Sequence, residues 1–93
     1  MKRDEIVQAI HNRIRNTTTP NYSNWIIGIT NDQEKRKTQH ETDKKNTKHW
    51  IYWRADSLAD ARHIENLFLS THKLGGGTGG TLDDKLPVYV YIF

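Results

Sequence analysis

The last six residues of the chain, 88–93, alternate strictly between aliphatic and aromatic side chains. The aliphatic set faces one way and the aromatic set the other: Val88, Val90 and Ile92 against Tyr89, Tyr91 and Phe93. This period of two residues predicts a β-strand. Two further short runs rich in β-branched and aromatic residues, 25–30 and 49–55, predict two more strands. The chain therefore has to build a sheet from three short strands.

Helices are predicted between and before these strands. Ile6, Ile10 and Ile14 recur every four residues and predict a helix over 3–15, and a similar apolar stripe predicts one over 57–73. The segment 32–42 also reads as a helix, but it has almost no apolar residues. We therefore expect this helix to be exposed to solvent on most sides or to line a polar cleft.

Five glycines within 75–80 predict a loop before the last strand, since neither a helix nor a strand tolerates such a run well. Backbone N–H groups of this loop could also cradle a phosphate, although the Lys-Ser/Thr of a nucleotide-binding loop is missing. The order of elements indicates an α+β fold in a single domain, 1–93: a small three-stranded, mainly antiparallel sheet flanked by helices.

Composition narrows the function classes. The 93 residues contain no cysteine, which excludes disulfides, thiolate zinc sites and thiol nucleophiles. No apolar stretch approaches the roughly 18 residues of a membrane span, and no export signal is visible, so we expect a cytoplasmic protein. The net charge of +3 slightly favours partners that carry phosphate.

An ordered set of residues in the middle of the chain resembles the GIY-YIG nuclease family. Ile26-Ile27-Gly28 stands where the family has Tyr-Ile-Gly, Arg36 follows eight residues after the glycine, and His40 follows four residues later. Glu65 then lies in the middle of a helix that begins at a serine. The resemblance covers about residues 24–72.

The resemblance implies a domain that acts on nucleic acid, as a Mg²⁺-dependent endonuclease that cleaves phosphodiester bonds, with DNA rather than RNA as the expected substrate. In the family pattern the mid-helix Glu, here Glu65, binds one Mg²⁺. The Arg, here Arg36, faces the phosphate, and Tyr and His side chains, here including His40, handle water and protons.

The chain departs from the family pattern at its tyrosines. The first motif, Gly-Ile-Tyr on a preceding strand, is absent, and Ile26 replaces the tyrosine of the second motif. We infer that the final strand fills the empty sheet position, so that Tyr89 or Tyr91 supplies the missing phenol. The catalytic candidates are therefore Arg36, His40, Glu65, Tyr89 and Tyr91.

Basic residues around the polar helix and the loop after it are candidates for nucleic-acid binding: Lys37, Lys44, Lys45, Lys48 and Arg54. Trp25, Trp50 and Trp53 could stack on bases, but at least two of them are expected in the core. Two alternatives to the nuclease stay open. One is an inactive GIY-YIG-like module that binds nucleic acid or protein, and the other is an unrelated adaptor whose motifs match by chance.

Overall fold

The computed structural model describes residues 1–18, 20–76, 82 and 85–93, and it has an α+β fold. Three helices are present in this part of the chain: α1 (Arg3–Arg15), α2 (Gln33–Thr42) and α3 (Leu58–Ser70). The strands are β1 (Ile26–Thr30), β2 (Ile51–Ala55), β3 (Gly75–Gly76) and β4 (Val88–Ile92), and a short 3-10 helix, Tyr22–Asn24, precedes β1. The three predicted helices and three predicted strands are confirmed, with ends that differ by at most three residues.

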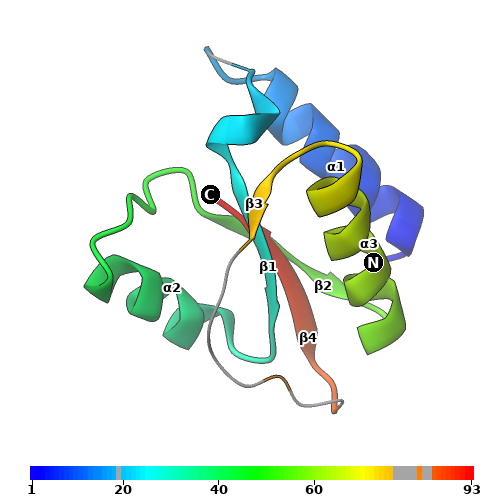
Figure 1. Ribbon diagram of the computed structural model, residues 1–93. Coiled ribbons are helices and arrows are strands. Elements are labelled where there is room, and N and C mark those ends of the chain that lie inside the picture. The colour runs from blue at the N-terminus through cyan, green and yellow to red at the C-terminus, as the bar shows by residue number, and fades with distance from the viewer. Residues whose placement is uncertain (19, 77–81, 83–84) are drawn as a thin grey trace.

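The strand order is β2-β4-β1-β3, so β4 lies in the middle of the sheet. It runs antiparallel to both neighbours, with Val90 opposite Ile29 of β1 and Trp53 of β2. The expected pairing of the last strand with the other two strands is therefore confirmed. Figure 1 shows β4, in red, between β1 and β2, although both of these strands come much earlier in the sequence.

The predicted strand number was wrong, because the described sheet has four strands and not three. The fourth, β3, comes from the glycine run that was expected to be a loop, and it pairs in parallel with β1. Lys73 adopts a left-handed conformation with φ 63° just before it, and Gly75 N–H then donates to the Trp25 carbonyl at 2.9 Å. The rest of the glycine-rich run, 77–80, lies outside the described residues. The possible phosphate binding by this loop stays a prediction.

The two faces of the sheet have different coverings. Figure 1 shows α1 and α3 side by side on one face and α2 on the other. The aliphatic side of β4 packs with α1 and α3 in one apolar core, which includes Ile6, Ile10, Ile64 and Phe68. The aromatic side of β4 faces α2. The sheet therefore separates an apolar core from a second layer that is built from aromatic and polar groups.

Candidate active site

The second layer is centred on Tyr91, whose side chain is completely buried. Tyr91 is the register partner of Gly28 on β1. A Cβ atom placed on Gly28 would collide with the hydroxyl and Cζ of the Tyr91 ring. The phenol can therefore lie flat across β1 because residue 28 has no side chain.

Two residues of α2, Arg36 and His40, meet the Tyr91 hydroxyl. The helix begins after Asp32, whose carboxylate accepts a hydrogen bond from Lys35 N at 3.1 Å and caps the first turn. Arg36 and His40 lie one turn apart and so share a helix face. Arg36 Nε donates to the Tyr91 oxygen at 3.2 Å, and His40 Nε2 lies 2.9 Å from the same oxygen.

These two residues are the buried face of α2. Arg36 is 7% exposed and His40 is 2% exposed. The rest of the helix is exposed or half-buried, so the expectation of a helix exposed to solvent on most sides is confirmed. Arg36 is held further by Gln39, whose Oε1 accepts a hydrogen bond from Arg36 Nη1 at 3.0 Å.

Burial affects the protonation state of His40. Desolvation lowers the pKa of His40, and the nearby positive charges of Arg36 and Lys45 lower it further. A neutral imidazole with its proton on Nδ1 can accept the phenol proton at Nε2, while Arg36 donates to the other side of the oxygen. In this arrangement His40 is a base placed directly against the Tyr91 hydroxyl.

Glu65 acts on the same phenol through its charge. The pKa of Tyr91 is raised, chiefly by burial, while Arg36 opposes the shift and the negative charge of Glu65 adds to it. Glu65 is half-buried on α3, and desolvation raises its own pKa despite the attraction of Arg62. The structure thus brings Arg36, His40 and Tyr91 into contact and places the Glu65 charge within their electrostatic reach.

Within the described ranges, no three His, Asp or Glu side chains gather as a metal-binding group. Mg²⁺ is commonly held by one or two carboxylates together with waters and substrate phosphate. Glu65 supplies one carboxylate of this kind, and burial raises its pKa although the charge of Arg62 opposes the shift.

An aromatic wall closes the site on one side. The Trp50 ring stacks on Tyr91 with centroids 4.4 Å apart and planes 20° apart. The Phe93 ring lies 4.7 Å from the His40 ring and 5.3 Å from Trp50. The Trp50 Nε1 and His40 Nδ1 atoms are buried and have no hydrogen-bond partner in the described part of the chain. Of the three tryptophans, Trp25 and Trp53 pack with the core, as expected for at least two of them.

Tyr89, the other phenol candidate, lies apart from this cluster. It is half-buried, and its ring packs edge-on against Tyr52 at 5.6 Å. Its register partners are Thr30 and Arg54. Of the two candidate tyrosines, the structure therefore places Tyr91 beside Arg36 and His40.

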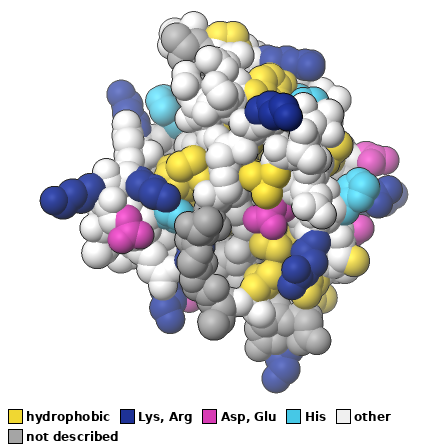
Figure 2. Space-filling model, in the orientation of Figure 1, with side chains coloured by type: hydrophobic (Ala, Val, Ile, Leu, Met, Phe, Trp, Pro, Cys, Tyr) yellow, Lys and Arg dark blue, Asp and Glu magenta, His cyan; other side chains and the backbone are white. Residues whose placement is uncertain are grey.

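The predicted nucleic-acid-binding residues surround α2 and the next loop. Lys44, Lys48 and Arg54 are exposed, and Lys37 and Lys45 are half-buried. Figure 2 shows Lys and Arg side chains over the α2 side of the molecule, at the left of the view, and also at other parts of the visible face. The basic residues are thus accessible, but they do not form a single continuous patch in this view.

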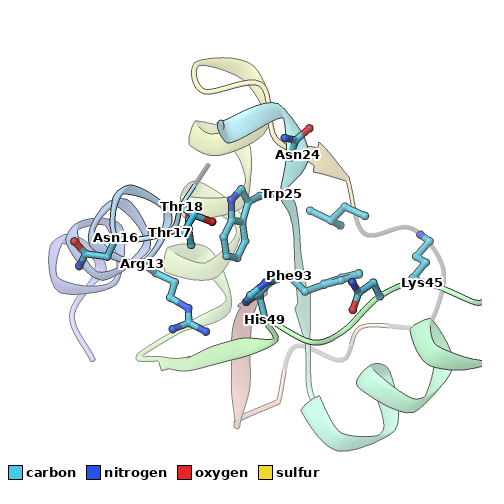
Figure 3. A pocket seen from close by; sticks show the side chains of 11 residues that line it. Arg13, Asn16, Thr17, Thr18, Asn24, Trp25, Lys45, His49 and Phe93 are labelled. Atoms are coloured by element: carbon cyan, nitrogen blue, oxygen red, sulfur yellow. The ribbon is translucent and has the colours of Figure 1, made fainter. Parts of the chain in front are cut away.

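Sequence reasoning missed a cavity of about 680 Å³ beside the start of β1 and the end of β4. Its lining includes Arg13, Trp25, Lys45, His49 and Phe93 (Figure 3). These residues come from four separate segments of the chain, so no local pattern could have revealed the cavity. The basic residues at 44–48 and the possible stacking role of Trp25 were the sequence signals that pointed near it.

Comparison of the chain with protein-family models, with curated proteins and with solved structures finds no match. The described part of the chain also contains no helix that is both long and apolar enough to cross a membrane. The functional argument therefore rests on the chain's own residues and their geometry.

Proposed function

We propose that this chain is a GIY-YIG-like domain that acts on nucleic acid and cleaves phosphodiester bonds with the help of Mg²⁺. The observation that carries the proposal is the meeting of Arg36, His40 and Tyr91 at one hydroxyl group. Arg36 and His40, on α2, were singled out because their order along the chain resembles that family. Tyr91, on β4, was inferred as a replacement for the tyrosine that the motif lacks.

The position of β4 supports the same proposal. The first strand of the family pattern is absent from this chain. Strand β4 lies beside β1, and the phenol of its Tyr91 lies directly over Gly28. Tyr91 can therefore take the place of the tyrosine that the motif lacks. The chain would then have a phenol beside the Gly28 strand, with that strand of the sheet supplied from a later point in the sequence. The Asn that commonly follows the Glu helix in the family has no counterpart here.

The proposed roles follow from charge and proton position. Arg36 supplies positive charge to the phosphate as negative charge develops on its oxygens. As the Tyr91 oxygen takes a proton from the attacking water, the phenol proton passes to His40, so that no free tyrosinate has to form. Glu65 would hold Mg²⁺, which when bound stabilises the charge on the phosphate and the leaving oxygen.

A specific observation favours a second candidate, a module that binds nucleic acid without cleaving it. Tyr91 is fully buried, and Trp50 stacks against its ring. A phenol in that position can serve to hold Arg36 and His40 in place and never meet a water molecule. The two candidates share the fold and the basic surface and differ in turnover.

The deciding experiment is a plasmid-nicking assay with Mg²⁺, with EDTA as the metal-free control. We expect nicking by the wild type and none by Glu65→Gln, because the amide keeps the shape of the side chain but not its charge. Glu34→Gln on the exposed part of α2 is the matched control and should retain activity. Nucleic-acid binding without nicking by the wild type would select the binding module, and equal nicking by both Glu variants and the wild type would place the metal elsewhere.

A further inference from the structure

We propose that the cavity beside the start of β1 binds one nucleotide of a single-stranded nucleic acid, next to the phosphate held at the candidate active site. This inference rests on the proposed function, since it names the form of nucleic acid that the site takes. The cavity has a volume of about 680 Å³, which lies within the range of roughly 300–1,000 Å³ typical of ligand pockets.

The cavity has an aromatic middle and cationic sides. Trp25 and Phe93 lie at its centre in Figure 3, with Arg13 on the α1 side and Lys45 on the opposite side. The His49 ring lies 6.0 Å from Trp25. An aromatic surface between two positive charges matches a base or sugar with a phosphate on each side, which is how single-strand binders combine stacking with charge.

Arg13 supplies an independent sign of a missing anion. Its Nε is buried and has no hydrogen-bond partner among the described residues. An unpaired buried donor on a charged group is costly, and a phosphate oxygen would satisfy it. Arg13 therefore points to an anionic ligand in this cavity rather than to an apolar one.

Lys45 connects the cavity with the active site. At the end of α2, Lys44 takes a left-handed conformation with φ 63°, and Lys45 N–H returns to the His40 carbonyl at 3.0 Å. This helix end places Lys45 next to His40, whose pKa its charge helps to lower. Phe93 also belongs to both the cavity and the candidate active site, because it lines the cavity and its ring centroid lies 4.7 Å from that of His40.

Uncharged polar side chains complete the cavity and suit a nucleobase. Asn16, Asn24 and Asn46 line it together with Thr17 and Thr18. Amides and hydroxyls can both donate and accept, so they can pair with the polar edges of an unpaired base. A base in a duplex has its Watson–Crick edge occupied by its partner and is stacked between its neighbours, which favours single-stranded over double-stranded substrate.

The test is an NMR titration of ¹⁵N-labelled protein in EDTA, so that binding is measured without cleavage. The probes are a trinucleotide of DNA, deoxyadenosine 5′-monophosphate, deoxyadenosine and inorganic phosphate. We expect the trinucleotide and the monophosphate to shift the Trp25 indole signal, the trinucleotide at lower concentration. The Trp53 indole, which is not among the residues that line the cavity, should stay in place.

Two variants, each with a matched control, test whether the charges of Arg13 and Lys45 bind the ligand. Arg13→Gln and Lys45→Gln should each weaken trinucleotide binding about tenfold. The controls Arg15→Gln, on an exposed position of α1, and Lys35→Gln, on an exposed position of α2, should not weaken it. Because Arg13 Nε has no hydrogen-bond partner among the described residues, Arg13→Gln should leave the free protein folded, with a nearly unchanged NMR spectrum.

Three results would overturn the inference: an unshifted Trp25 indole, equal affinities of Arg13→Gln and Arg15→Gln, or the same shift with inorganic phosphate alone. Binding of the monophosphate but not of the trinucleotide would also overturn it, since the cavity would then serve a free nucleotide. The nuclease proposal fails separately, through absence of nicking, and a protein that binds here without nicking would keep this inference and lose that one.

Discussion

The Tyr91 ring lies across Gly28 on the neighbouring strand, in the space that any other side chain at position 28 would occupy. Both residues are buried, and the phenol meets Arg36 and His40 beyond the strand. The glycine is therefore needed for the position of the hydroxyl and not for an unusual backbone conformation.

Gly28→Ala should destabilise the fold by about 1–3 kcal/mol, because the new methyl group forces the Tyr91 ring out of its place. The measurement is urea unfolding followed by tryptophan fluorescence. Gly76→Ala is the matched control, since a Cβ there meets only Leu69 at an ordinary 3.7 Å. Equal stability of the two variants would show that the ring does not lie over Gly28.

Tyr91→Phe should lower the free energy of unfolding by about 1–3 kcal/mol, because Arg36 Nε and His40 Nε2 lose their buried partner. Tyr89→Phe should change it by less than about 0.5 kcal/mol, the usual effect of a substitution away from buried networks. The same urea experiment compares the two variants. A larger effect at Tyr89 would contradict the assignment of the phenol to Tyr91.

Arg36→Ala should reduce nicking by about 10²–10³, the loss seen when one electrostatic donor to a transition state is removed. Lys35→Ala, on the exposed side of the same helix, should keep wild-type activity. Circular dichroism has to accompany the assay, because Arg36 is also part of the buried network. A folded Arg36→Ala variant with full activity would remove this residue from the mechanism.

Nucleic-acid affinity should fall with salt, and the exposed lysines of the 44–48 loop should contribute to the slope. Each phosphate contact adds about 0.7 to the slope of log K against log salt for a single strand. Replacing Lys44 and Lys48 by Gln should therefore reduce the slope by about 1.4, as measured by fluorescence anisotropy. The control is Lys2→Gln with Arg3→Gln, exposed positions at the start of α1, and it should leave the slope unchanged.

Acidification should destabilise the protein below a pH of about 6.5, the ordinary pKa of histidine. Burial is the main reason that the pKa values of His11 and His40 are lowered in the folded chain, so the unfolded chain binds protons first as the pH falls. Stability is then complete above 6.5 and declines toward the folded pKa values. Unfolding curves between pH 8 and 5 should show this decline, and His40→Gln should make it shallower; an unchanged slope would mean that His40 is protonated equally in both states.

Much of the fold was predictable because period and propensity agree with tertiary structure in most segments. The isoleucines of α1 and the alternation in β4 both mark the faces that the core buries. The fourth strand was not predictable, because Gly75 and Gly76 carry no side chains and pair only through their backbone with β1. The end of α3 was placed three residues late, at 73, where Lys73 adopts a left-handed conformation that no local preference of lysine announces.

For the candidate site, the sequence predicted a shared helix face but not which phenol meets it. The spacing of Arg36 and His40 indicated a shared helix face, and the absence of apolar residues in α2 indicated a polar environment. The sequence could not decide between Tyr89 and Tyr91, because alternation puts both on the same side of β4. That choice depends on the register with β1, which places Tyr91 opposite the residue that has no side chain.

The central position of β4 also determines when the sheet can form as the chain is made. Residues 88–92 supply the hydrogen bonds for β2 and most of those for β1, yet they are made after both. A nascent chain that has not reached them carries two apolar strands with unpaired edges, a state prone to aggregation. Folding therefore has to wait for distant contacts, which are slow to close, and we expect the domain to fold in a single late step rather than strand by strand during synthesis.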